Sequence, residues 1–445
     1  MRPPTLAIDS SGNPYVLVAV WRTASPPILD YLLLFSKSNG IWSADTFELN
    51  AEDPLYSIAL TIDKNNRPWC IYTAYYNDGV DTVWYLIVVH KDSTGWVKDT
   101  VESRRPQDGP SFYWTSITTD NLLGVHIAYD YSINGWHYAY YAFLNDSIWQ
   151  KEKVDTTFIG DYCCSIDVDS QNRPHISYFR DTASIGENLW YAKKVDSVWY
   201  CEEVDHTMFA SWWPTSIRVN PVNDLPAIAY RDPLTYQMKY AWYDGTIWHI
   251  DIVALEGFIM SPQVLDFDSS GRPWMIYCDE GYGRTFVAYK DTNGFWHTEL
   301  LPLLPPLTYS YPGALRIGQD GTIHMTRIGN SDDFCVREIH YIYGTPEGIE
   351  EGAGIKMAGE RSKLIITPNI VRGNARIQFT IFEKQCISLK LYDLTGREVM
   401  VISDGIIDAG THSYDLNVTS LISGIYFLIL EGEKEVKTRK LLVIR

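Results

Sequence analysis

The sequence predicts an all-β protein, with a seven-bladed β-propeller followed by a small immunoglobulin-like (Ig-like) β-sandwich. Three observations carry this prediction. Aromatic residues make up 14 % of the 445 residues, and aromatic side chains favour strands. A sequence segment recurs at intervals of 47 to 57 residues in the first part of the chain. The composition then changes near Gly344, which indicates a domain boundary.

The recurring segment has the form of two short strands joined by a tight turn. An apolar stretch ends at an Asp, a turn built on Gly or Asn follows, and a second apolar stretch begins at a Pro, as in Asp169–Tyr178. Gly and Asn accept the left-handed backbone conformation of such a turn, and Pro is tolerated at the first residue of a strand. The residues at the Pro position are Pro14, Pro68, Val125, Pro174, Pro226, Pro273 and Ile323.

Two further strands complete each repeat. The third strand carries an aromatic residue, as in Leu189–Ala192, and the fourth carries a late Trp. Four short strands in a period of about 40–50 residues are typical of a propeller blade, so seven anchor positions predict seven blades. The late Trp residues are Trp42, Trp96, Trp149, Trp199, Trp248 and Trp296.

The repeats, exemplified by Asp169–Tyr178, resemble those of bacterial extracellular propellers of the sialidase-like type. The resemblance covers residues 5–344. A sialidase Asp box has the pattern Ser-x-Asp-x-Gly-x-x-Trp, whereas Asp268, Gly271 and Trp274 have one more residue between Asp and Gly. The sequence also lacks the arginine-triad pattern of a sialidase carboxylate clamp, so the resemblance does not imply sialidase activity.

The seventh repeat differs from the other six. It runs from Ala314 to Tyr343, and no late Trp follows its third strand. Propellers commonly complete their last blade with an N-terminal strand, but here the first strand of the first repeat begins at Thr5. We therefore expect a signal peptide and one strand to precede Met1 in the native protein, and the last blade of this chain to have three strands and an exposed edge.

Composition divides the chain into three parts. Residues 1–344 contain all 16 Trp and carry 24 basic and 42 acidic residues, whereas residues 356–445 carry 13 basic and 10 acidic residues. We expect a propeller at 1–344, a flexible linker at 345–362 and a sandwich at 363–445. The acidic propeller should repel nucleic acid and anionic lipid. No apolar run reaches about 18 residues, so the sequence predicts no membrane-spanning helix.

The last 83 residues alternate apolar and polar positions, which predicts a small β-sandwich. Their motifs resemble, in order, those of the type A sorting domain of the type IX secretion system, except that Ile370 stands where a second Pro is usual. The resemblance implies the type IX secretion machinery as a partner and a secreted or cell-surface location with attachment to the outer membrane. The motifs are Pro368–Asn369, Leu391–Glu398, Gly410–His412, Ser423–Tyr426 and Thr438–Ile444.

Aromatic residues gather in the loops that lead from each fourth strand to the next repeat. The topology places these loops on one face, and aromatic rings beside polar groups suit sugar rings, whose C–H faces stack on them. The alternative is that the rings wedge between blades as packing. The candidate ligand-binding residues are Tyr113, Trp114, Asp161, Tyr162, Trp212, Trp213 and Tyr311.

Charged residues occupy the first-strand position two before the turn in the fourth to seventh repeats. They alternate in sign as Asp167, Arg218, Asp266 and Arg316, and we expect them to line the central channel. One interpretation is a structural ring of ion pairs between blades. The other is a catalytic carboxylate pair, which glycosidases hold about 5–10 Å apart. The Arg between the two Asp residues favours the first, because it keeps both carboxylates ionised.

No catalytic, cofactor or metal site emerges from the motifs. The seven Cys show neither a C-x-x-C pair nor zinc spacing. His126, His175 and His324 share one second-strand position, for which we expect a repeated packing role. We expect a monomer that binds a glycan or a surface protein without catalysis. The alternative function is a glycoside hydrolase or lyase that acts on extracellular polysaccharide.

Overall fold

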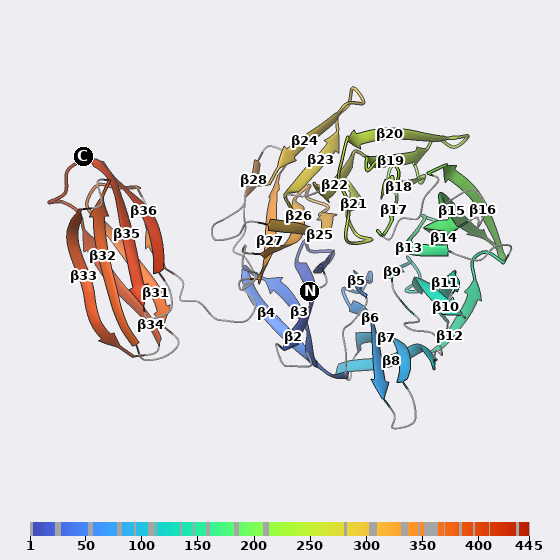
Figure 1. Cartoon of the computed structure of the whole chain (residues 1–445), viewed down its shortest axis with the longest axis horizontal. Helices are drawn as coiled ribbons and strands as arrows, with labels where there is room; N and C mark the ends of the chain where they lie inside the picture. The colour runs from blue at the N-terminus through green and yellow to red at the C-terminus, as the bar shows by residue number, and fades with distance from the viewer. Residues whose placement is uncertain are drawn as a thin grey trace. The chain divides into compact units, whose positions relative to one another are not determined.

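The structure is a computed structural model, and the chain divides into two compact units, Met1–Ile355 and Lys356–Arg445 (Figure 1). The described residues form strands and no helix, which confirms the all-β prediction, and so none of them belongs to a helix that could cross a membrane. The structure describes residues 3–22, 28–51, 57–77, 82–92, 95–105, 112, 114–133, 136–145, 147–156, 161–181, 187–207, 213–279, 283–301, 309–330, 337–345, 348–350, 364–368, 370–381, 385–394, 397–408, 410–432 and 436–444.

The first unit contains seven four-stranded antiparallel sheets in its described part, which we number in chain order. The first strands are β1 (Thr5–Ile8), β5 (Ile58–Ile62), β9 (Thr115–Thr119), β13 (Asp161–Val168), β17 (Ser216–Val219), β21 (Leu265–Phe267) and β25 (Tyr309–Ile317). The second strands are β2 (Pro14–Arg22), β6 (Pro68–Asn77), β10 (Val125–Ile133), β14 (Pro174–Asp181), β18 (Pro226–Arg231), β22 (Pro273–Cys278) and β26 (Ile323–Asn330). Five of these second strands begin at the Pro of the repeat, as predicted.

The third and fourth strands form the outer half of each sheet. The third strands are β3 (Ile28–Ser38), β7 (Thr82–Asp92), β11 (Trp136–Asn145), β15 (Glu187–Val195), β19 (Met238–Tyr243), β23 (Thr285–Lys290) and β27 (Arg337–Thr345). The fourth strands are β4 (Ile41–Ala51), β8 (Gly95–Arg104), β12 (Ile148–Lys153), β16 (Val198–Asp205), β20 (Trp248–Ala254), β24 (Trp296–Leu300) and β28 (Gly348–Glu350).

The sheets follow one another around a common centre, which gives a propeller-like fold (Figure 1). Each first strand contacts the first strand of the next sheet, and β25 contacts β1. The Thr326 hydroxyl donates to the Pro4 carbonyl at 3.2 Å, so a hydrogen bond also joins the seventh sheet to the start of the chain.

The prediction of a three-stranded last blade is wrong. β28 pairs antiparallel with β27, with Tyr343 opposite Glu350 and Thr345 opposite Gly348. An edge strand needs only backbone donors and acceptors, so three extended residues after the turn supply it without a late Trp. Ile349 lies opposite Gly344, at the register position that Trp199 occupies opposite Lys194 in the fourth sheet.

A buried carboxylate organises the turn between the first and second strands. In the fourth sheet, Asp169 Oδ1 accepts from the backbone N–H groups of Gln171 and Arg173 at 3.0 and 2.9 Å. Its Oδ2 accepts from Arg173 Nε at 2.6 Å and lies 3.1 Å from His175 Nε2. The same pair of backbone bonds recurs at Asp9, Asp63, Asp120 and Asp268.

Successive turns are also bonded to each other. The turn position with positive φ holds Asn66 in the second sheet and Asn172 in the fourth, at φ 61° and 63°. Asn66 Oδ1 accepts from Ser10 N at 2.9 Å, and Asn172 Oδ1 accepts from Asn121 N at 3.0 Å. Asn tolerates this backbone conformation, and its side chain supplies an acceptor that Gly lacks.

The late Trp of one sheet packs edge-on against a third-strand Tyr of the preceding sheet. The ring centroids lie 5.1–5.3 Å apart in three such pairs, a favoured aromatic geometry. A fourth pair, Trp42 with Tyr341 at 5.2 Å, links the first sheet to the seventh in the same way. The three other pairs are Trp199 with Tyr141, Trp248 with Tyr191 and Trp296 with Tyr240.

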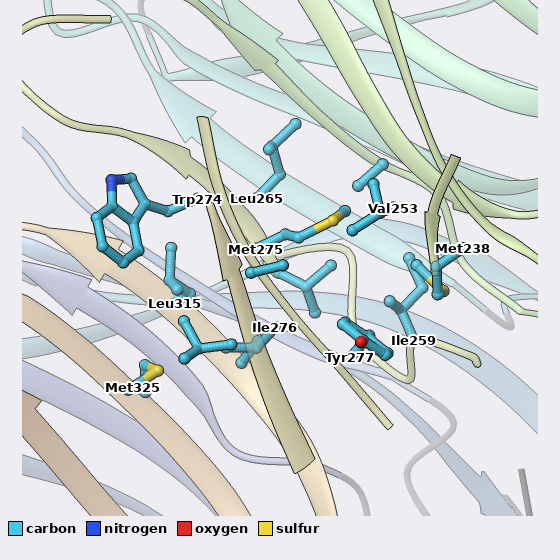
Figure 2. Packing of buried hydrophobic residues seen from close by; sticks show 14 of the residues in the cluster. Met238, Val253, Ile259, Leu265, Trp274, Met275, Ile276, Tyr277, Leu315 and Met325 are labelled. Carbon is cyan, nitrogen blue, oxygen red and sulfur yellow. The ribbon is translucent and has the colours of Figure 1, made fainter. Parts of the chain in front are cut away.

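The core lies between neighbouring sheets. Figure 2 shows β22 with Met238 and Ile259 on one side and Leu315 and Met325 on the other. All these side chains are buried. Because each sheet contributes both of its faces to such a core, the second strands are apolar throughout instead of alternating, as the buried residues of Pro273–Cys278 show.

The three second-strand His residues connect strands within their sheets. Nδ1 of His126, His175 and His324 lies 2.8, 2.6 and 2.5 Å from the hydroxyl of a third-strand Tyr. The Nε2 atoms of His126 and His175 contact the turn Asp, but the seventh sheet has Gly318 at that position. Nε2 of His324 is consequently buried without a hydrogen-bond partner.

The second unit has two sheets in its described part. One consists of β29 (Ile365–Thr367), β31 (Asn374–Ile381) and β34 (Gly410–Asn417). The other has the order β30 (Ile370–Val371), β36 (Val436–Val443), β35 (Gly424–Gly432), β32 (Gln385–Asp393) and β33 (Glu398–Ile407). Both sheets contribute to one hydrophobic core, which includes Ile377 and Phe379 from the first and Leu389 and Leu428 from the second. This arrangement is a two-sheet sandwich.

We predict that Gly313→Ala destabilises the first unit by about 1–3 kcal/mol, the usual cost of overpacking. A Cβ at Gly313 would lie 2.5 Å from Pro4 O and 2.5 Å from Thr326 Oγ1, where the seventh sheet meets the first. Urea unfolding followed by Trp fluorescence measures this unit alone, because every Trp precedes residue 345. Gly318→Ala is the control, since the close contact of its Cβ would be with the exposed Asp320 carboxylate, which can move, and His324 Nε2 would lie at an ordinary 3.6 Å. Equal stability of the two variants would contradict the prediction.

We also predict that His324 makes the first unit less stable in acid. Burial lowers the pKa of His324 to about 4, and the Asp320 carboxylate offsets only part of this effect. The unfolded chain therefore binds this proton near pH 6.5, while the folded chain binds it only near pH 4. Stability should fall across that interval, by up to about 3 kcal/mol for this group. His324→Gln should reduce the difference in unfolding free energy between pH 7 and pH 4, whereas His206→Gln, at an exposed His, should leave it unchanged.

Candidate functional site

A cavity of about 510 Å³ lies at the centre of the first unit and is lined mainly by the first strands. The structure places all four charged residues of the predicted channel on its wall. The equivalent residues of the other three sheets line it as well. The seven residues at this position are Ala7, Thr61, Thr118, Asp167, Arg218, Asp266 and Arg316.

Arg218 bridges the two Asp residues of the cavity. Its Nη1 lies 3.3 Å from Asp167 Oδ1, and its Nη2 lies 2.9 Å from Asp266 Oδ1. Each carboxylate also accepts a backbone N–H from the next sheet, from Val219 and from Ile317, both at 2.9 Å. Burial alone would lower the pKa of Arg218, but the two carboxylates outweigh it and raise that pKa.

A short segment forms the floor of the cavity at the end where the first strands begin. Gln263 Nε2 donates to Leu60 O at 2.8 Å, and Gln263 Oε1 accepts from Leu6 N at 3.3 Å. The preceding carbonyl, Pro262 O, accepts from the hydroxyls of Ser165 at 3.2 Å and Ser216 at 3.1 Å. A segment before the sixth sheet thus joins the first, second, fourth and fifth sheets below the cavity.

Sequence reasoning missed this floor. A signal was present for the Ser residues, because Ser116, Ser165 and Ser216 all lie four residues before the turn residue. Each accepts an N–H from the next sheet, Ser116 from Ile166 at 3.3 Å and Ser165 from Ile217 at 3.2 Å. No signal marked Gln263, whose position is not Gln in any other repeat.

Arg316 is the remaining charged residue of the cavity wall. Its Nη1 donates to the carbonyls of Leu315 at 2.7 Å and Gln263 at 3.5 Å. It forms no ion pair with any residue that the structure describes. Burial and the nearby Arg218 lower the pKa of Arg316 to about 10.

The aromatic loop residues that the structure describes lie in two groups. The ring of Trp213 lies 4.7 Å from that of the buried Phe258 in a tilted contact, and Tyr311 lies 6.3 Å from the same Phe258 ring, so we call these three residues the aromatic row. Both outer members, Trp213 and Tyr311, are half-buried. Trp114 is also half-buried, but it packs against the hydrophobic cluster that includes Phe179 and belongs to the fourth and fifth sheets. The sequence did not single out Phe258 as the centre of the row.

The other four predicted ligand residues lie wholly or partly outside the described residues. Tyr113 and Trp212 lie outside the described residues. Asp161 and Tyr162 belong to β13, opposite Arg180 and Phe179, but their side chains are outside the described part. In the same described part, no group of three or more His, Cys, Asp or Glu residues is arranged to hold a metal ion.

The C-terminal unit matches a known family. Residues 366–444 match the family model described as the secretion system C-terminal sorting domain, which confirms the resemblance to a type IX sorting domain. The chain is therefore of the class of secreted or cell-surface proteins, here with an all-β, propeller-like unit before the sorting domain. No curated protein has a significant match to the chain.

Several solved structures are similar to the chain. PorZ of Porphyromonas gingivalis, described as an essential surface component of the type-IX secretion system, is 12 % identical, with 98 % of this chain and 74 % of PorZ covered and a TM-score of 0.35. A protein of unknown function from Dyadobacter fermentans is 10 % identical, with 77 % and 93 % covered and a TM-score of 0.45. Prolyl oligopeptidase B of Galerina marginata is 10 % identical, with 84 % and 54 % covered and a TM-score of 0.46. Likeness at this level says nothing about activity.

We predict that Gln263→Met destabilises the first unit by about 1–3 kcal/mol, because it leaves Leu6 N and Leu60 O buried without partners. Met keeps the length of the side chain, so lost packing contributes little. Urea unfolding followed by Trp fluorescence measures the effect. Gln150→Met, at an exposed position of β12, should change stability by no more than about 0.5 kcal/mol. Similar values for both variants would mean that the floor does not stabilise the unit.

Proposed function

We propose that the chain is a surface-displayed, closed seven-bladed propeller that binds a glycan or protein partner without catalysis, through the face that carries the aromatic loops. The row formed by Trp213, Phe258 and Tyr311 carries the proposal. Trp and Tyr are large, rigid and partly polar, and such residues supply much of the energy at binding sites. The buried Phe258 fixes Trp213 from below, so its ring is oriented before a ligand arrives.

The contacts between the seventh and first sheets support the closed seven-bladed form. The pair Trp42–Tyr341 repeats the contact made between other neighbouring sheets, and β25 contacts β1. For the domains, we retain a propeller from residue 1, a linker and a sorting sandwich at 363–445. Residues 345–350 move from the predicted linker to the propeller, because β28 pairs with β27.

The cavity favours binding over hydrolysis. A glycosidase needs one carboxyl group that is protonated when the substrate binds. Asp167 and Asp266 share Arg218, and each accepts a backbone N–H as well, so both are already engaged by donors of the protein. The cell-surface location given by the sorting domain suits a protein that meets extracellular polymers.

We predict that the double variant Trp213→Ala/Tyr311→Ala binds its ligand at least about tenfold more weakly, the loss of one or more aromatic anchors. The measurement is a glycan-array screen of the full chain, followed by titration of each glycan bound. Tyr200→Ala removes a 60 % exposed ring from the fourth strand of the fourth sheet and should leave affinity unchanged.

A second measurement separates loss of binding from loss of folding. Urea unfolding should show that the double variant retains a cooperative transition, because neither outer ring is fully buried. Wild-type affinity in the double variant would exclude the aromatic row as the site. Failure of the wild type to bind any glycan would exclude the glycan form of the proposal.

A further inference from the structure

The central cavity has Pro262 and Gln263 at one end and exposed turns at the other. Pro262 and Gln263 form its floor. Its opposite end is lined by Asn121, Ser170 and Pro221, which lie in the turns after the first strands and are exposed. A cavity of about 510 Å³ has the size of a small-molecule site.

Arg316 is the charged residue of the cavity wall that forms no ion pair with a described residue, although Asp167 and Asp266 lie near enough to act on it electrostatically. Arg218 takes up both carboxylates, Asp167 and Asp266, at 3.3 and 2.9 Å. Among the described residues, Arg316 donates to the backbone carbonyls of Leu315 and Gln263, both through Nη1. Its Nε and Nη2 make no hydrogen bond to the described residues. A planar guanidinium with free donors on two nitrogen atoms matches the geometry of a carboxylate.

The two acids that line the mouth of the cavity, Asp169 and Asp224, have partners of their own. Asp169 is paired with Arg173 at 2.6 Å and Lys193 at 3.2 Å. Asp224 holds the backbone N–H and the hydroxyl of Ser170, both at 2.8 Å. Arg316, by contrast, forms no ion pair with a described residue.

The rest of the wall indicates the body of the ligand. The hydroxyl of the half-buried Thr61 makes no hydrogen bond to any described residue, so it is available to a ligand. Ile62 and Ile317 also line the cavity and supply apolar groups. Hydroxyl and apolar groups together suit a compact ring with alternating polar and C–H surfaces.

We propose that the central cavity is a binding site for a small hydroxylated carboxylate of monosaccharide size, whose carboxylate is held by Arg316. The site is separate from the aromatic row, so it stands or falls independently of the proposed function. The bound carboxylate forms an ion pair with Arg316, and Thr61 contacts a hydroxyl group of the ligand.

The test is calorimetric titration of the full chain with sodium D-glucuronate. We expect saturable binding of one molecule per chain, no binding of the neutral D-glucose at the same concentrations, and no displacement by an equal concentration of chloride. Arg316→Gln should weaken glucuronate binding by about tenfold or more, because a charge-assisted hydrogen-bond pair is lost. Arg284→Gln, which removes an Arg paired with Asp279 outside the cavity, should leave affinity unchanged.

A second measurement does not depend on any variant. Phenylglyoxal modifies accessible guanidinium groups, and peptide mass spectrometry identifies the modified residue. Glucuronate, but not glucose, should protect Arg316 in the wild-type chain. The proposal is overturned if glucuronate does not bind, if glucose or chloride competes equally well, if Arg316→Gln binds as tightly as the wild type, or if Arg316 is modified at the same rate with and without glucuronate.

Discussion

The buried carboxylate of the turn aspartate is the interaction on which the rest of the propeller-like unit depends. In five sheets one oxygen of this group accepts two backbone N–H groups, which fixes the turn between the first and second strands. In four of them the other oxygen contacts a Trp or His six residues later, which ties the turn to the second strand. The first strand ends next to this Asp, so the turn sets the direction of that strand. The residue two positions before the Asp then lines the central cavity. The turns therefore determine which side chains line the cavity.

Contacts between neighbouring sheets use a Trp–Tyr pair at four junctions. At each of these the late Trp of one sheet meets a third-strand Tyr of the preceding sheet, and at three of them the Trp Nε1 donates to an acid on the preceding fourth strand. The seventh sheet has Ile349 at the Trp position, and the sixth has Val287 at the Tyr position. The first and second sheets have Leu34 and Val88 at the Tyr position although Trp96 and Trp149 follow in the next sheets, and Trp96 packs edge-on against Phe47 of the first sheet. The junctions therefore differ in the residues that fill this position, which close packing allows as long as the volumes match.

Much of this architecture was predictable because it repeats. The Asp turn and the Pro at positions such as Pro174 locate the first two strands of each sheet, and counting back two residues identifies the seven cavity positions. What could not be predicted depends on features that occur once. Gln263 has no equivalent in other repeats, and its partners lie more than 200 residues away. The short β28 carries no late Trp to mark it. Arg218 pairs with both Asp residues, so Arg316 forms no ion pair with a described residue, and the alternation of charge sign in the sequence does not give these distances.

The hydrogen bonds of Gln263 also determine when, during synthesis of the chain, the first two sheets can be completed. They join residues separated by 257 and 203 positions, so Leu6 and Leu60 cannot reach their final state until the chain has been synthesised past residue 263. Contacts at such separations carry a high loop-closure entropy and slow the folding reaction. The first two sheets consequently remain incomplete while the middle sheets form, with unpaired backbone groups at their inner ends. The unit can complete its floor only after the segment before the sixth sheet has been synthesised. Any product that ends before this segment is exposed to aggregation.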